Sequence, residues 1–219
     1  MHKITPPDWA RARAGHRFAA LDPQRTALIN IDLQRAFMAP GLVFGKPHAL
    51  DIAPNINRLS AAMRARDGKV AWTRQTYTDE PPFAPPEWHY DASNPHVARA
   101  MAALRKGAPG HALHELMAVE GSDAVLDKYR YSALLCPAGQ LERWLKATAA
   151  DTLIITGTLT NCCCESTARD AHMMGYRVFF VSDATAGVTD EEHNAALLNL
   201  MLMFADIRRT AEMLALISA

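Results

Sequence analysis

The chain has 219 residues, of which 49% are hydrophobic, and it carries 23 basic and 23 acidic side chains. This apolar content excludes global disorder, and the balanced charge leaves no basic field to hold a nucleic-acid backbone. The sequence shows neither an apolar run long enough for a membrane span nor a signal peptide, and its four cysteines do not resemble a secreted disulfide scaffold. We therefore expect a cytoplasmic protein whose partner is a small molecule rather than nucleic acid or a membrane.

Short apolar runs alternate with helical patterns along the chain. After an N-terminal arm, residues 1–24, strands are expected over residues 26–31, 69–74, 124–127, 152–156, 177–181 and 206–209. Helices are expected over residues 49–66, 139–150, 161–175 and 190–205, with one more at the C-terminal end. Strands that alternate with helices pair in parallel through right-handed crossovers. The chain is therefore predicted to form one domain, residues 1–219, with an α/β fold: a three-layer α/β/α sandwich around a mostly parallel, Rossmann-like sheet of about six strands.

One long connection interrupts this alternation. Residues 75–93 contain several prolines and aromatic side chains, a composition too irregular for a helix or a strand. A loop of this length in a compact domain is usually a lid or a binding loop. A merely structural excursion is the equal alternative.

Three adjacent cysteines, Cys162, Cys163 and Cys164, lie where a predicted strand gives way to a predicted helix. The N-terminus of a helix presents unpaired N–H groups and a partial positive charge, both of which favour the reactive thiolate over the thiol. Asp32 and Lys128 also follow predicted strands, and ligands in parallel α/β folds bind beyond the carboxyl ends of the strands. We therefore expect these residues, distant in sequence, to meet at one edge of the sheet.

The cysteines belong to a segment that resembles a known family. Residues 157–171, GTLTNCCCESTARDA, are similar to the nucleophile segment of the isochorismatase-like cysteine hydrolase superfamily. In that segment the pattern Thr-Asn, any residue, Cys, any residue, Glu-Ser-Thr recurs, and Cys163 falls on the nucleophile position. The resemblance extends from about Thr26 to the C-terminus and implies a homo-oligomer, a dimer or a tetramer.

Two further segments carry the same resemblance. The sequence INIDLQ at residues 29–34 looks like the family's first-strand motif and places its aspartate at Asp32. The sequence VLDK at residues 125–128 looks like the segment that carries the family's lysine, here Lys128. Taken alone, the aspartate is equally natural as a helix cap and the lysine as a solvated surface residue. The order and combination of the three segments favour an Asp-Lys-Cys triad.

The chemistry of these side chains agrees with the resemblance. A free thiol has a pKa of about 8.5, so it needs help to become a nucleophile near neutrality. Asp32 can take the thiol proton and later pass it to a leaving amine, while Lys128 stabilises both anions. Attack on a carbonyl produces an oxyanion that needs N–H donors. The backbone at Leu159 and Cys163 could supply these donors, and the resemblance implies that a cis peptide bond before Leu159 aims them.

The other two cysteines have weaker cases. Adjacent residues on a helix point about 100° apart, so at most one of the three enters a pocket well. Cys164 shares helical spacing with Ala168, Ala171 and Gly175, a stripe of small residues that is predicted to pack on the sheet. The spacing leaves Cys162 ambiguous.

The sequence gives no support for a metal or a cofactor. His111, His114 and Glu115 form a short cluster without a convincing third ligand. The nicotinamidase branch of the superfamily holds a metal through an aspartate and histidines, but residues 36–48 contain no Asp-any-His triplet and the loop after Arg74 lacks Asp-Trp-His-Pro. No phosphate-binding or dinucleotide motif is present in the sequence.

The predicted function is therefore hydrolysis of a C–N bond in a small amide, carbamoyl or ureido compound, with a thioester intermediate and release of ammonia. Isochorismatases proper replace the cysteine, so the retained thiol favours the carbamoyl and ureido amidohydrolases of the superfamily. Five residues are candidates for substrate contact, with packing or plain exposure as the alternative: Phe37, Arg74, Gln75, Trp88 and Tyr131. The alternative function is a thiol redox or sensor protein that uses the cysteine cluster.

Overall fold

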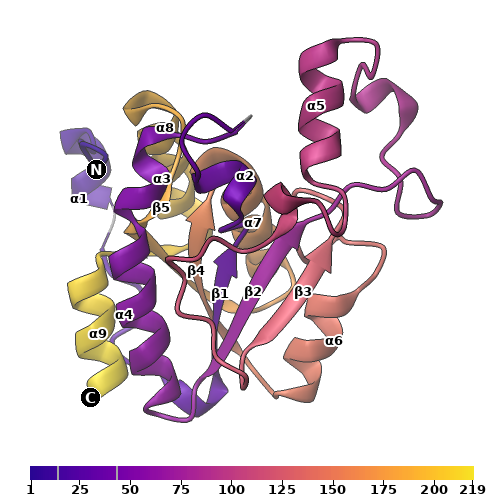
Figure 1. Ribbon diagram of the computed structural model, residues 1–219. Helices are drawn as coiled ribbons and strands as arrows, with labels where there is room; N and C mark the ends of the chain where they lie inside the picture. The colour runs from indigo at the N-terminus through magenta and orange to yellow at the C-terminus, as the bar shows by residue number, and fades with distance from the viewer. Residues whose placement is uncertain (14, 43) are drawn as a thin grey trace.

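The computed structural model describes residues 1–13, 15–42 and 44–219. Its centre is a six-stranded sheet in the order β3-β2-β1-β4-β5-β6, with every neighbouring pair parallel (Figure 1). The strands are β1 (Thr26–Ile31), β2 (Lys69–Gln75), β3 (Ala124–Lys128), β4 (Thr152–Thr158), β5 (Arg177–Ala186) and β6 (Asp206–Arg208). The predicted α/β fold with a parallel sheet of six strands is confirmed.

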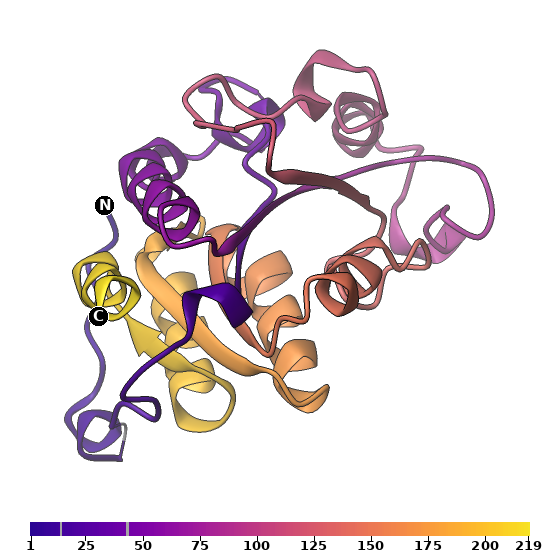
Figure 2. The ribbon, with the colours of Figure 1, turned by 90° about the horizontal axis from the view of Figure 1, so that it is seen from below.

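Helices cover both faces of the sheet (Figures 1 and 2). On one face the apolar side chains of α3 (Pro47–Asp51), α4 (Ala53–Arg64) and α9 (Thr210–Ser218) pack on alternate strand residues such as Leu28 and Trp72. On the other face α6 (Gln140–Ala147), α7 (Glu165–Met173) and α8 (Asp190–Asn199) pack on the intervening residues, among them Ile29 and Ile155. Both faces of the central strands are thus buried, which explains why these strands are continuously apolar rather than alternating.

Three predicted helices are divided. The helix expected over residues 49–66 breaks at Ile52 into α3 and α4, and Pro54 lies in the first turn of α4, where a missing N–H costs no hydrogen bond. The helix expected over residues 161–175 opens with a wide π turn, η4 (Thr160–Cys164), before α7. The long helix expected from Asp190 similarly ends in a π turn, η5 (Leu200–Phe204).

The connection between β2 and β3 projects beyond the carboxyl ends of these strands (Figure 1). It contains η2 (Glu87–His89), α5 (Pro95–Ala103) and η3 (Pro109–His111), and we call residues 76–104 the lid. Two short elements, α1 (Asp8–Arg13) and η1 (Pro23–Arg25), precede β1. Of the helices in the described ranges, none combines the length and the apolarity needed to cross a lipid bilayer.

Candidate active site

Asp32 lies directly after β1 and is held by the strands on both sides. Its backbone takes a left-handed conformation, φ 52°, which aspartate tolerates better than most residues. Thr73 of β2 donates its hydroxyl to Asp32 Oδ1 at 2.8 Å, and the hydroxyl of Thr158 on β4 donates to the Asp32 carbonyl at 3.0 Å. The carboxylate is fully buried, so its position is set by the sheet and not by solvent.

A glycine permits the close approach of β4 to β1 beside Asp32. The register of β4 against β5 shifts between Ile155 and Gly157, and Gly157 has φ +112°. A Cβ atom at Gly157 would lie only 2.1 Å from the carbonyl oxygen of Ile31, the residue before Asp32. Only glycine fits both this backbone conformation and this contact.

Lys128, the last residue of β3, lies at the centre of the polar cluster. Its Nζ lies 2.8 Å from Asp32 Oδ2 and 3.4 Å from Cys163 Sγ. It also donates hydrogen bonds to Gln75 Oε1 at 2.6 Å and to the carbonyl oxygen of Arg130 at 3.0 Å. Burial alone would lower the pKa of Lys128, but the negative charge of Asp32 and the sulfur of Cys163 outweigh it and raise that pKa. The side chain is therefore a permanent buried cation.

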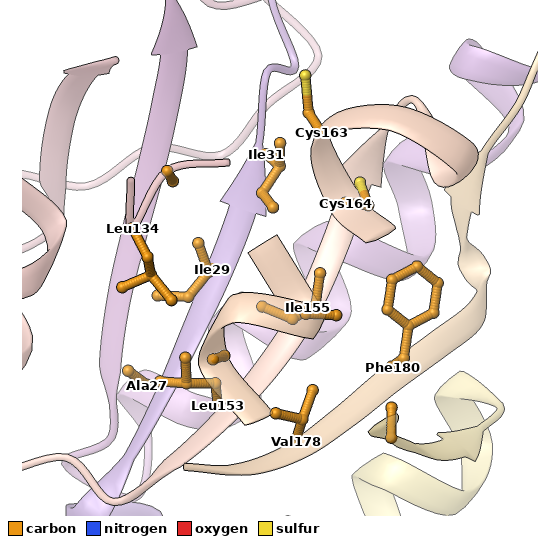
Figure 3. Packing of buried hydrophobic residues seen from close by; sticks show 14 of the residues in the cluster. Ala27, Ile29, Ile31, Leu134, Leu153, Ile155, Cys163, Cys164, Val178 and Phe180 are labelled. Carbon is orange, nitrogen blue, oxygen red and sulfur yellow. The ribbon is translucent and has the colours of Figure 1, made fainter. Parts of the chain in front are cut away.

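Cys163 is the cysteine that enters this cluster. Figure 3 shows its sulfur pointing past the end of β1 near Ile31, whereas the sulfur of Cys164 lies among Ile155 and Phe180 in the core. The assignment of Cys164 to the core, with Ala168 and Ala171, is confirmed by their complete burial.

The surroundings of the Cys163 thiol raise its pKa. A hydrogen bond with Cys162 contributes most, burial and the Asp32 charge add to it, and Lys128 opposes it. The same hydrogen bond lowers the pKa of Cys162. The Asp32 carboxylate is the nearby base that could accept the proton of the Cys163 thiol as the sulfur attacks a substrate.

The turn before Cys163 contains an unusual peptide bond and is held by its own backbone hydrogen bonds. The peptide bond between Thr158 and Leu159 is cis, as the resemblance implied. The Leu159 carbonyl accepts hydrogen bonds from the N–H groups of Cys162 at 3.1 Å and Cys164 at 3.2 Å, on either side of Cys163. Thr160 is anchored separately, with its hydroxyl 2.8 Å from Nδ1 of the buried His193 on α8.

A cavity of about 240 Å³ opens onto Cys162 and Cys163 beneath the lid. Its apolar wall includes Phe37, Phe44, Val97, Met101, Leu104 and Leu159. Its polar groups are the Gln75 amide, the imidazole of His96 and three tyrosines, Tyr77, Tyr90 and Tyr131. The ambiguous Cys162 thus lines the cavity instead of packing in the core.

The five candidates for substrate contact fall into two groups. Phe37, Gln75 and Tyr131 line the cavity. Arg74 instead forms an ion pair in which two of its guanidinium nitrogens contact Asp127 Oδ1, at 2.7 and 2.8 Å, and it is absent from the cavity wall. Trp88 lies on the outside of the lid and is 83% exposed.

The described residues contain two histidine clusters to consider as metal sites: the one predicted around His111, and a second one around His2. His111 is buried with Nε2 2.8 Å from the Thr76 hydroxyl, away from Glu115, which pairs with Arg35 at the surface. The atoms of His2, His48 and Asp190 lie close enough together to share an ion.

Both ring nitrogens of His2 are nevertheless in use. Nδ1 bonds Asp190 at 2.7 Å, and Nε2 accepts the Gly187 N–H at 2.9 Å. A metal at Nδ1 would require a proton on Nε2, which would oppose the Gly187 N–H. The ring is therefore satisfied as a structural hydrogen-bonding group.

Several residues of the site were missed from sequence. Gln34, fully buried, clamps the end of β2: its Oε1 accepts the Gln75 N–H at 2.7 Å and its Nε2 donates to the Gln75 carbonyl at 3.1 Å. The α5 side of the cavity was also missed, although a signal existed. Asn94 caps the helix, and Val97, Ala100, Met101 and Leu104 follow at helical spacing.

Comparison with known proteins agrees with this geometry. The isochorismatase domain family matches residues 26–212. A ureidoacrylate amidohydrolase of Methylobacterium radiotolerans is 33% identical over 199 residues, covering 84% of this chain and 76% of that protein. Nicotinamidase 3 of Arabidopsis thaliana is 42% identical over 87 residues, covering 40% of this chain and 43% of that protein. The crystal structure of a cysteine hydrolase from Pseudomonas syringae pv. phaseolicola aligns with a TM-score of 0.81 and 27% identity, covering 93% of this chain and 96% of that one. The chain belongs to the isochorismatase family.

Proposed function

We propose that this protein is a cysteine amidohydrolase that needs no metal ion, cleaves the C–N bond of a small amide, carbamoyl or ureido compound, and releases ammonia. The observation that carries the proposal is the position of Lys128 Nζ, which contacts both Asp32 Oδ2 at 2.8 Å and Cys163 Sγ at 3.4 Å, next to the cavity that opens onto Cys163. The name of the ureidoacrylate amidohydrolase relative supports the same reaction class.

The first half-reaction begins with Asp32, whose Oδ2 lies 2.8 Å from the Lys128 ammonium. This oxygen takes the proton from the Cys163 thiol as the sulfur attacks the carbonyl carbon, forming the C–S bond and moving the C=O electron pair onto oxygen. The N–H groups of Leu159 and Cys163 stabilise this oxyanion. When it collapses, the C–N bond breaks, the leaving nitrogen takes the proton from Asp32, and ammonia departs.

The second half-reaction restores the enzyme. Asp32 takes a proton from water as the water oxygen attacks the thioester carbon. The tetrahedral intermediate expels the sulfur, and the proton held by Asp32 returns to Cys163. Lys128 remains charged throughout, so it stabilises whichever of the carboxylate and the sulfur is the anion at each stage.

The thiol redox alternative has less support. All four cysteines are free thiols, but a hydrogen bond with Cys162 and burial raise the pKa of the Cys163 thiol, whereas peroxide chemistry requires the thiolate. The pKa of Cys162 is lowered by the same hydrogen bond, and the charges that act on it are those of the shared cluster, Lys128 and Asp32. A carboxylate base beside the sulfur is useful for acyl transfer and unhelpful for redox exchange.

An ammonia-release screen under reducing conditions tests the proposal, with simple amides, carbamoyl compounds and ureides as substrates. The variant Cys163→Ala is expected to fold and to lose turnover completely. The matched variant Cys164→Ala removes a neighbouring thiol that faces the core and should retain turnover. Substantial ammonia release by Cys163→Ala would refute the nucleophile assignment, and peroxide reduction without ammonia release would favour the redox alternative.

A further inference from the structure

The cavity beside Cys163 is built to receive an uncharged group. Phe37 and Phe44 stack with ring centroids 5.1 Å apart, and Met101 and Leu104 complete the apolar wall. The described residues that line the cavity include no lysine, arginine, aspartate or glutamate. A carboxylate placed here would lose its hydration without gaining an ionic partner, which is strongly unfavourable.

Three cations at, or just after, the carboxyl ends of β2 and β3 are already engaged in other contacts. Arg130 donates to four backbone carbonyls, those of Tyr129 and of lid residues Pro82, Phe83 and Ala84. Arg74 is paired with Asp127, and Lys128 is surrounded by the catalytic cluster. None of these three side chains is therefore available to bind a substrate carboxylate.

The size of the cavity matches a single ring. An engineered apolar cavity of about 150 Å³ is sufficient to hold benzene, and this cavity measures about 240 Å³. The difference leaves room for the planar amide or ureide that must reach Cys163.

One polar group in the wall lacks a partner. The hydroxyl of Tyr77 is buried and makes no hydrogen bond with the described residues, and the residue as a whole is only 7% exposed. The rings of Tyr77 and Tyr90 pack edge to face with their centroids 5.1 Å apart, but the Tyr90 hydroxyl donates to the Tyr131 hydroxyl at 2.8 Å. A buried donor without an acceptor is unfavourable, so a ligand atom that accepts this O–H would bind preferentially.

We propose that the substrate is a neutral amide or ureide whose non-reacting part is an apolar group the size of one aromatic ring, with one hydrogen-bond acceptor placed for the Tyr77 hydroxyl. This inference rests on the proposed amidohydrolase function. It separates the protein from its ureidoacrylate amidohydrolase relative, because ureidoacrylate is an anion and no lysine or arginine is among the described residues that line this cavity.

The first test compares substrates that share a reacting group and differ in charge. Benzamide is paired with 4-carbamoylbenzoate, and phenylurea with N-carbamoylglycine. The neutral member of each pair is expected to have the higher kcat/KM, by about 100-fold. Equal or higher kcat/KM for the carboxylates would overturn the proposal.

A charge introduced into the wall should reverse this preference. Val97 lies on the cavity side of α5, and Ala98, the next residue, is exposed and outside the cavity wall. Val97→Arg is expected to raise kcat/KM for 4-carbamoylbenzoate and to lower it for benzamide, while Ala98→Arg leaves the ratio as in the wild type. A ratio unchanged in Val97→Arg would contradict the assignment of this cavity.

The role of Tyr77 is tested with the three pyridinecarboxamide isomers, which have the shape of benzamide and place an acceptor at different ring positions. One isomer is expected to exceed benzamide in kcat/KM by about 10-fold, the effect of a single hydrogen bond. Tyr77→Phe should abolish that advantage, so that this isomer and benzamide have similar kcat/KM in the variant. An advantage that survives in Tyr77→Phe would exclude the proposed hydrogen bond.

Binding to Cys163→Ala, measured by calorimetry, separates this inference from the reaction. If the wild type releases ammonia chiefly from carboxylate-bearing substrates, the proposed function stands and the cavity assignment fails. If it releases ammonia from no compound but the variant binds benzamide more tightly than 4-carbamoylbenzoate, the cavity assignment stands and the proposed function fails. Equal affinities for the two would count against the cavity assignment.

Discussion

Gln75 and Lys128 end neighbouring strands at the same register, and their side chains meet with Oε1 2.6 Å from Nζ. Because an ammonium can only donate, the oxygen of the Gln75 amide must face it, which turns the NH₂ group the other way. Gln75 also lines the cavity. One side chain therefore touches both the buried cation and the space where a substrate would lie.

Gln75→Leu is expected to lower kcat about 10- to 100-fold, because a hydrogen bond to a buried charged group contributes about 1.5–3 kcal/mol. Steady-state ammonia release measures the effect, and circular dichroism checks that the fold is retained. Gln24→Leu, at an exposed position outside the site, is the matched control. Full activity in Gln75→Leu would show that Lys128 is positioned without the amide.

Asp32→Asn keeps the shape of the side chain and removes its charge. Activity is expected to fall by about 10²- to 10⁴-fold because the base is lost. The free energy of unfolding should fall by about 3–5 kcal/mol, because Lys128 becomes a buried charge without its partner.

The double variant Asp32→Asn/Lys128→Met tests whether the two residues act as a pair. It is expected to be inactive yet more stable than Asp32→Asn alone, since no buried charge remains. Urea unfolding of the wild type, both single variants and the double variant completes the cycle. Additive losses of stability would contradict a direct ionic interaction.

Gly157→Ala is expected to reduce both stability and activity. The added methyl group would collide with the Ile31 carbonyl at 2.1 Å, so β1 and β4 must move apart next to Asp32. We expect a loss of at least about 2 kcal/mol in the free energy of unfolding, as for other substitutions at incompatible backbone positions. Gly121→Ala is the control, because its added Cβ meets nothing within 4 Å. Equal stabilities of the two variants would show that the contact can relax.

Acid should destabilise the protein through His193. Burial lowers its pKa to about 3, against an unfolded value of about 6.5. Above pH 6.5 His193 is neutral in both the folded and the unfolded state, and its contribution to stability is complete. Between pH 6.5 and about pH 3 the imidazole is protonated in the unfolded chain but stays neutral in the folded protein. The free energy of unfolding should therefore fall by about 1.4 kcal/mol per pH unit, or about 2 kcal/mol at pH 5.

His193→Asn isolates this effect. An amide can still bond the Thr160 hydroxyl but does not titrate, so the difference in stability between pH 7 and pH 5 should shrink by about 2 kcal/mol. His172→Asn, at an exposed position on α7, is the control and should leave the difference unchanged. Parallel pH profiles for the wild type and His193→Asn would refute the assignment.

The sheet was predictable because a central parallel strand is apolar throughout. The predicted residues 26–31 are the observed bounds of β1, and all six of its side chains are buried. The meeting of Asp32, Lys128 and Cys163 was predictable for a related reason: each follows or ends a parallel strand, and the carboxyl ends of parallel strands share one edge.

The surroundings of these residues were less accessible to sequence reasoning. The clamp made by Gln34 and the hydroxyl contacts of Thr73 and Thr158 depend on which strands are neighbours, and no local pattern records that order. The ion pair of Arg74 with Asp127 on the adjacent strand depends on the same strand order. The helix α5 could have been found from its cap and apolar stripe.

Arg130 connects the buried lysine to the loop that follows β2. Its carbonyl oxygen accepts a hydrogen bond from Lys128 Nζ, and its guanidinium donates hydrogen bonds to the backbone oxygens of residues 82–84. Because a backbone oxygen is present whatever the side chain, residues 82–84 can be substituted without removing these hydrogen bonds. The segment therefore stays tied, through Arg130, to the buried ammonium of Lys128 whatever its own composition.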